Sequence, residues 1–147
     1  MIGSWQDLEA EVEKHLKEHQ RLSKLAYHRF FDSKSAGSLL PAQPADFLVT
    51  YHGATLLIEA KFSGVHDSLR AAFSGAVKAH QLASARIWTR AGAGYFLLFY
   101  SAPANSFEVW EGLYCAERRS VGKPLELVKR RVFASLPKAL GDMLGHG

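Results

Sequence analysis

The clearest pattern along the chain is a pair of apolar runs, DFLVTY (46–51) and ATLLIEAK (54–61), with His52 and Gly53 between them. Both runs have the composition of β-strands. A residue that tolerates positive φ, followed by Gly, is typical of the two-residue turn of a tight hairpin. We therefore predict that the two runs pair as antiparallel strands.

This hairpin would bring three charged side chains together at its open end. With the turn at residues 52–53, Asp46 lies opposite Glu59, and Lys61 points to the same side of the sheet as Glu59 because alternate strand residues share a face. Burial of the other face fixes this register, since a slip by one residue would turn its side chains toward water. That face carries Phe47, Val49, Tyr51, Leu56, Ile58 and Ala60.

Helical and strand-like patterns flank the hairpin on both sides. In residues 4–20, Trp5, Leu8, Val12 and Leu16 form one stripe, which predicts a helix capped by Ser4. Helices are also predicted over 67–86 and 124–144, strands over 26–31, 95–102 and 107–110, and a loop over 32–44. The predicted order, αβββαββα, indicates an α/β fold in which helices flank a mixed sheet.

Length and composition favour one globular domain over residues 1–147, with 48% apolar and 22% charged residues. The chain has no apolar run near the roughly 20 residues that span a membrane. Cys115 is the one cysteine, which excludes an intrachain disulfide and zinc fingers and favours a reducing, cytoplasmic compartment. The net charge of +4 is compatible with a polyanionic partner but too small to establish one.

Two carboxylates and an ammonium at one end of a hairpin suit metal-assisted phosphodiester hydrolysis. Mg²⁺ and Mn²⁺ prefer oxygen ligands, and Mg²⁺ is usually held by one or two carboxylates together with water. A neighbouring lysine can orient the attacking water or balance the charge of the transition state. Asp46, Glu59 and Lys61 supply these groups. The alternative is a carboxylate pair at a sheet edge beside a solvated lysine.

The same residues resemble the core motif of the PD-(D/E)XK nucleases. Pro-Ala-Asp-Phe (44–47) is followed by Ile-Glu-Ala-Lys (58–61), then by a predicted helix and the strand YFLLFY (95–100). The proline is displaced by one position, because the chain has Pro-Ala-Asp where the motif has Pro-Asp. The resemblance implies a restriction-endonuclease-like α/β fold over residues 1–147.

Within that superfamily the chain looks most like the RecU-type Holliday-junction resolvases, over most of residues 8–128. The further matching features are Leu8-Glu9, His80-Gln81, the run Gly94 to Leu98, and the basic stretch Arg118 to Val121. About 14 residues separate Phe31 from Asp46, too few for the long stalk that RecU proteins insert there. The compact layout also resembles the archaeal resolvases, and a phage-encoded enzyme would fit it.

The resemblance implies a homodimeric, Mg²⁺-dependent endonuclease, with Mn²⁺ as a substitute, that cuts four-way DNA junctions in recombination and repair. Carried over to this chain, Asp46, Glu59 and Glu9 would hold the metal. Lys61 would assist the attacking water, and Gln81 would support the site from the following helix. From the residues alone, Glu9 and Gln81 are equally compatible with solvated surface positions.

Basic and polar residues outside the hairpin are candidate DNA contacts. Lys34 and Ser38 lie in the loop before it, and Arg118, Arg119 and Lys123 lie in a basic C-terminal segment. The alternatives are a plain loop and a solvated helix face. Two other functions stay open: a different nuclease on the same core (nicking, restriction-like or exonuclease), and a DNA-binding protein of this fold without activity.

Overall fold

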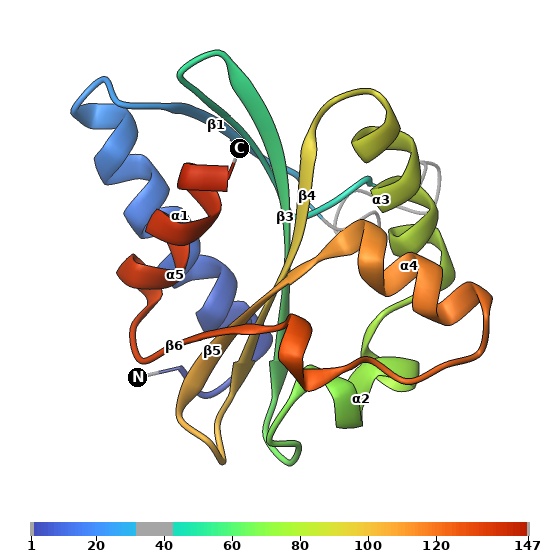
Figure 1. Cartoon of the computed structure of the whole chain (residues 1–147). Coiled ribbons are helices and arrows are strands. Elements are labelled where there is room, and N and C mark those ends of the chain that lie inside the picture. The colour runs from blue at the N-terminus through green and yellow to red at the C-terminus, as the bar shows by residue number, and fades with distance from the viewer. Residues whose placement is uncertain (1, 32–42, 147) are drawn as a thin grey trace.

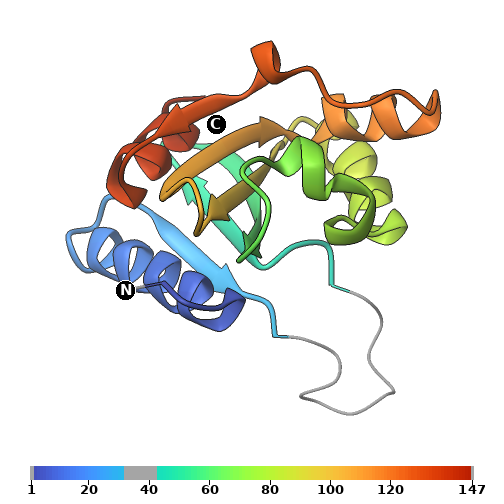
Figure 2. The ribbon, with the colours of Figure 1, turned by 90° about the horizontal axis from the view of Figure 1, so that it is seen from below.

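The computed structural model describes residues 2–31 and 43–146. They form a six-stranded mixed sheet in the order β1-β2-β3-β4-β5-β6, with helices on both faces (Figures 1 and 2). Strands β3 and β4 are parallel, and the other neighbouring pairs are antiparallel. The predicted α/β class with a mixed sheet between helices is confirmed. Among the described helices, none is both long and apolar enough to cross a membrane.

The central hairpin consists of β2 (Phe47–Tyr51) and β3 (Ala54–Ser63). Its register matches the prediction, with Phe47 opposite Ile58 and Tyr51 opposite Ala54. His52 and Gly53 have φ values of 49° and 80°, so the turn needs two residues in the left-handed region. Strand β2 begins at Phe47, one residue later than expected, which leaves Asp46 just outside the ladder.

Helices α1 (Trp5–Arg21) and α5 (Leu136–His146) cover one face of the sheet, on the left in Figure 1. Ser4 caps α1 as predicted, its side chain accepting a hydrogen bond from the Asp7 amide. Leu8, Val12 and Leu16 are buried, which confirms most of the predicted stripe. The assignment of Trp5 to that stripe is wrong, because 48% of its surface is exposed at the first turn.

Helices α2 (Leu69–Ala76), α3 (Ala79–Arg90) and α4 (Gly112–Ser120) cover the opposite face, on the right in Figure 1. The single helix predicted over 67–86 is therefore wrong. Val77 has extended backbone angles and a side chain only 1% exposed, so the chain bends there to bury this β-branched residue. The helical spacing of apolar residues continues through the bend, because both helices bury apolar residues on the same face.

Strands β4 (Gly94–Ser101) and β5 (Ser106–Glu111) lie close to their predicted positions, and β1 (Ala26–Arg29) is two residues shorter than predicted. The helix predicted over 124–144 is wrong in its first half. That stretch contains the short 3₁₀ turn Leu127–Lys129 and the edge strand β6 (Arg131–Phe133). Pro137 lies in the first turn of α5, where a missing N–H costs no helical hydrogen bond.

Candidate active site

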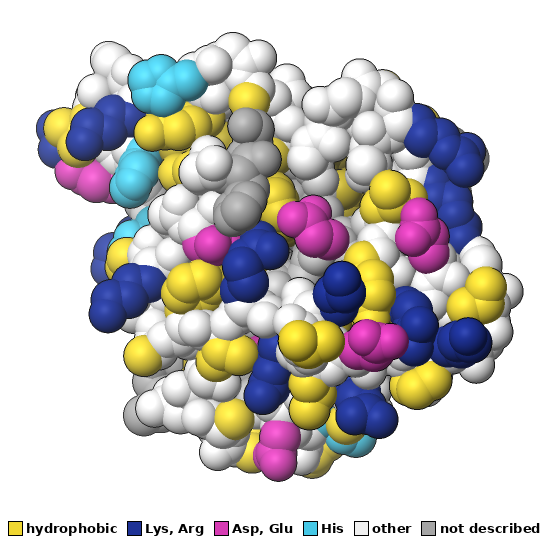
Figure 3. Space-filling view, viewed as in Figure 1, with side chains coloured by type: hydrophobic (Ala, Val, Ile, Leu, Met, Phe, Trp, Pro, Cys, Tyr) yellow, Lys and Arg dark blue, Asp and Glu magenta, His cyan; other side chains and the backbone are white. Residues whose placement is uncertain are grey.

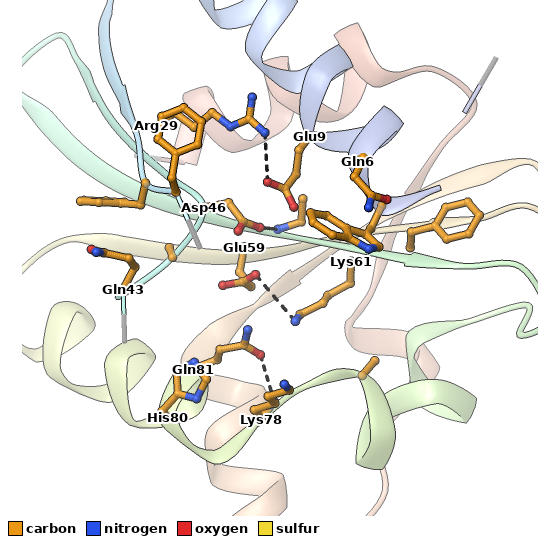
Figure 4. Close-up of a pocket in the computed structure, with 17 residues that line it drawn as sticks. Gln6, Glu9, Arg29, Gln43, Asp46, Glu59, Lys61, Lys78, His80 and Gln81 are labelled. Carbon is orange, nitrogen blue, oxygen red and sulfur yellow. Dashed lines mark hydrogen bonds and ion pairs between the residues drawn. The ribbon is translucent and has the colours of Figure 1, made fainter. Parts of the chain in front are cut away.

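A cavity of about 600 Å³ opens where the N-terminal part of α1, the end of β1, the start of β2 and the N-terminus of α3 approach β3. Its charged and amide side chains converge from all of these elements (Figure 4). Glu9 comes from α1 and Gln81 from α3, on opposite sides of the pair formed by Asp46 and Glu59. The polar side chains that line it include Glu9, Arg29, Asp46, Glu59, Lys61, Lys78 and Gln81.

Asp46 is held in place by both of its neighbouring strands. Its amide donates to the Ile58 carbonyl at 3.1 Å, and its carbonyl accepts from the Phe30 amide at 2.8 Å. Its side chain replaces the next backbone acceptor of the ladder, because Oδ2 accepts from the Ala60 amide at 2.8 Å. The carboxyl is thus directed across the hairpin toward β3, as the register predicted.

Glu59 and Lys61 project from β3 on the same side as Asp46. Glu59 is 5% exposed, and the Lys61 Nζ lies 3.7 Å from its Oε2. Lys61 is half-buried and lines the same cavity. The structure therefore brings Asp46, Glu59 and Lys61 together, as the hairpin geometry predicted.

The pKa values of the two central carboxyls, Asp46 and Glu59, are both raised. Burial raises the pKa of Asp46 above its usual value, although the Ala60 amide and Lys61 act in the opposite direction. Burial and the charge of Asp46 together raise the pKa of Glu59 well above its usual value. A hydrogen bond between the two carboxyls favours the neutral form of Glu59 and the charged form of Asp46. A cation at this position would relieve the repulsion between them.

Glu9 is the third carboxyl at the cavity, and it is 8% exposed. Arg29, at the end of β1, lies 3.4 Å from Glu9 Oε1 and 2.8 Å from Glu13 Oε1. Burial and the nearby charge of Asp46 raise the pKa of Glu9 to about 7, against the opposing effect of Arg29. Glu9 therefore faces the cavity as predicted, with Arg29 as its partner.

Replacing Glu9 with Gln should stabilise the metal-free protein at neutral pH. An acid whose pKa rises on folding, here from 4.5 to about 7, costs stability progressively as the pH rises from 4.5 to 7. One pKa unit corresponds to about 1.4 kcal/mol. We expect Glu9→Gln to stabilise the protein by about 2 kcal/mol at pH 7.5. This is less than the full pKa difference implies, because Arg29 loses one carboxylate partner and keeps only Glu13.

Urea unfolding in EDTA at pH 4 and pH 7.5 measures this difference. The gap between the two proteins should be small at pH 4 and should open as the pH rises. A gap that does not depend on pH would contradict a neutral Glu9 in the folded state below pH 7.

Gln81 has a structural partner in addition to its place at the cavity. Its Oε1 accepts from the Lys78 amide at 2.9 Å, which ties the first turn of α3. Its side chain is 9% exposed, and its amide group lies below Glu59 and Lys61 in Figure 4. His80 is exposed at the rim of the same cavity.

The donor chemistry of the cavity suits an oxygen-seeking divalent cation. Among residues 2–31 and 43–146, no three His, Cys, Asp or Glu side chains are placed to hold a metal ion by themselves. The structure thus does not assemble the predicted three-carboxylate set of Asp46, Glu59 and Glu9. Two adjacent carboxyls with open space beside them nevertheless fit Mg²⁺, which keeps several of its waters.

The residues predicted to contact DNA differ in their surroundings. Lys34 and Ser38 lie outside the described residues. Lys123 is exposed after α4. Arg118 donates to the Pro124 carbonyl and pairs with Glu126. Figure 3 shows basic side chains grouped at the outer side of α3, and elsewhere on this face mixed with acidic and hydrophobic ones.

Arg119 has an internal role. Its guanidinium donates to the Phe73 and Val77 carbonyls, both at 3.0 Å, and lies 4.4 Å from the centre of the Phe73 ring. These carbonyls lie at the C-terminus of α2, just before Lys78 at the cavity. Arg119 therefore fixes the bend between α2 and α3. Its contact with DNA stays a prediction.

Replacing Arg119 with Ala should lower the free energy of unfolding by about 2 kcal/mol, because hydrogen bonds to charged groups contribute about 1.5–3 kcal/mol. Lys123→Ala is the matched control, since Lys123 is exposed nearby and should change stability little. Denaturant unfolding of both variants checks the prediction. Equal stability of the two would mean that the Arg119 hydrogen bonds contribute nothing measurable.

Sequence reasoning missed three residues of this site: Arg29, Lys78 and Tyr95. Arg29 would have followed from pairing the predicted strand 26–31 with DFLVTY, which places it opposite Phe47, the residue after Asp46. Lys78 reaches the cavity because the chain bends at Val77. The Tyr95 hydroxyl donates to the Pro44 carbonyl at 2.5 Å, and no local pattern marks that contact.

No protein-family model matches the chain, and no curated protein matches it. One similar solved structure is that of Archaeoglobus fulgidus Hjc, described as a Holliday junction resolvase from an archaeal hyperthermophile. The TM-score is 0.45 at 15% sequence identity, and the match covers 69% of this chain and 74% of that one.

Proposed function

We propose that this chain is a metal-dependent, structure-selective DNA endonuclease that resolves four-way junctions. The observation that carries the nuclease part is the buried pair of Asp46 and Glu59 with Lys61 beside it, open to one cavity. Junction selectivity rests on the resemblance of the sequence to Holliday-junction resolvases. Both parts are tested by the same experiment below.

Asp46 and Glu59 would hold Mg²⁺ or Mn²⁺, and Glu9 lines the same cavity. When bound, such an ion polarises a phosphoryl oxygen and lowers the pKa of its water. The Ala60 amide orients the Asp46 carboxyl toward this position. Burial disfavours a charged Glu59 without a partner, so a bound cation would stabilise its carboxylate form.

Lys61 would orient the attacking water and balance the negative charge that develops on the phosphate. Its Nζ is held by Glu59 and directed into the cavity, where solvent is partly excluded. A charge fixed in advance in such a place stabilises a transition state more than the same charge in water. Gln81 and Lys78 would border the phosphate from the first turn of α3.

The test uses a labelled immobile four-way junction and a linear duplex of matched sequence, each with Mg²⁺ and with EDTA. Symmetric, Mg²⁺-dependent cuts confined to the junction are the expected result. Equal cutting of the duplex would retain the nuclease and reject the junction selectivity. Tight binding without cutting, in Mn²⁺ as well, would reject the enzyme and leave a DNA-binding protein of this fold.

A further inference from the structure

Tyr95 connects β4 to the segment that leads into Asp46. It lies opposite Leu57 in the parallel ladder, two residues before the partner of Glu59, and therefore on the same face of the sheet as the carboxyls. Its side chain is 1% exposed, and its hydroxyl donates to the Pro44 carbonyl at 2.5 Å. The bond thus fixes the backbone two residues before Asp46.

The other side of the Tyr95 ring is fixed by Gly112, the first residue of α4. A Cβ at this position would lie 2.6 Å from Tyr95 Cδ1, 3.0 Å from its carbonyl oxygen and 3.1 Å from the Ala85 Cβ. No side chain larger than hydrogen therefore fits without moving the ring or the strand. Gly112 and Pro44 hold the phenol from both ends.

Asp46 is bound to both neighbouring strands by its backbone, and the segment that leads into it, through Pro44 and Ala45, precedes the start of β2. Its carboxyl takes the place of a backbone acceptor for the Ala60 amide, so the orientation of this side chain depends on how the preceding peptides enter the strand. Ala45, between Pro44 and Asp46, is buried at 3% exposure and packs in the same cluster as the Tyr95 ring. A shift at Pro44 would therefore be transmitted to Asp46.

We propose that Tyr95 is a positioning residue, whose hydroxyl fixes the Pro44 carbonyl and thereby the direction in which the Asp46 carboxyl faces Glu59 and the cavity. The inference deepens the proposed nuclease site and rests on it. Tyr95 touches neither substrate nor metal in this role. It acts on the site through Asp46 alone.

The primary test is Tyr95→Phe, which removes one hydroxyl and keeps the ring. Tyr100→Phe is the matched control, because Tyr100 is a buried residue of the same strand whose hydroxyl donates to Asn105 at 3.0 Å. The readout is hydrogen exchange of the Ala60 amide in the metal-free protein, with the Leu57 amide of the same strand as internal reference. In Tyr95→Phe, exchange of Ala60 relative to Leu57 should accelerate about 10-fold, and in Tyr100→Phe it should stay unchanged.

A second readout is binding of Mn²⁺ alone, followed by its electron paramagnetic resonance signal. Loss of a group that orients a metal ligand typically weakens binding 10- to 100-fold, so Tyr95→Phe should weaken Mn²⁺ binding about 10-fold. Gly112→Ala, which displaces the ring but keeps the hydroxyl, should change the Ala60 amide in the same direction.

Unchanged relative exchange of Ala60 in Tyr95→Phe would overturn the inference, whatever the protein cleaves. The proposed function fails separately, if the wild-type protein cuts neither junction nor duplex. Acceleration that is equal for Ala60 and Leu57 would indicate general loosening of β3, and would also reject a specific positioning role.

Discussion

Replacing Asp46 with Asn should abolish junction cleavage, with a loss of at least about 10³-fold in the single-turnover rate. Such a loss corresponds to about 4 kcal/mol of transition-state stabilisation. Asn keeps the shape of the side chain, and its carbonyl oxygen can still accept from the Ala60 amide. What it removes is the charge that would hold a divalent cation.

Binding of the junction should persist in Asp46→Asn, because phosphate contacts and not this carboxyl supply affinity for DNA. Electrophoretic mobility shift in EDTA measures that binding, and quenched-flow cleavage in Mg²⁺ measures the rate. Asp67→Asn serves as the control, since Asp67 is exposed outside this cavity. A cleavage rate of Asp46→Asn within a few-fold of wild type would remove Asp46 from the site.

Replacing Lys61 with Ala should slow the chemical step by about 10² to 10³-fold, the usual cost of removing one preorganised group that stabilises developing charge. The Lys61 ammonium lies 3.7 Å from Glu59 and is the nearest cation to the carboxyl pair in the described part of the chain. Its loss should leave Mn²⁺ binding equal or tighter, because a positive charge beside the carboxyls is removed.

A slower chemical step without weaker Mn²⁺ binding would distinguish Lys61 from a metal ligand. Single-turnover rates at saturating Mg²⁺ report the chemistry, and Mn²⁺ titration reports metal affinity. Lys17→Ala, on the exposed side of α1, should change neither quantity. An unchanged single-turnover rate in Lys61→Ala would leave Lys61 as a partner of Glu59 without a part in catalysis.

The centre of the site could be predicted from the sequence because it is local. One tight turn at His52 and Gly53 sets the register, and the register alone places Asp46, Glu59 and Lys61 on one side of the sheet. The buried opposite face excludes the alternative register. The positions of these three side chains therefore follow from the turn and the strand pairing alone.

The rest of the site depends on contacts between distant segments. The bend at Val77 brings Lys78 to the cavity, and it is stabilised by Arg119, more than 40 positions farther along the chain. The helical spacing of apolar residues does not reveal such a bend when the helices on both sides of it bury the same face. Charge and the resemblance to resolvases predict DNA contacts for the basic residues of the C-terminal quarter, whereas Arg119 makes hydrogen bonds within the fold.

Both edges of the sheet are formed by short strands. The edge strands β1 and β6 have only 4 and 3 residues, so each offers few free backbone groups to another strand. Short edges are a common protection against strand-to-strand aggregation. If the proposed resolvase acts as two copies on one junction, contact through helix and loop surfaces is therefore favoured over a continuous intermolecular sheet.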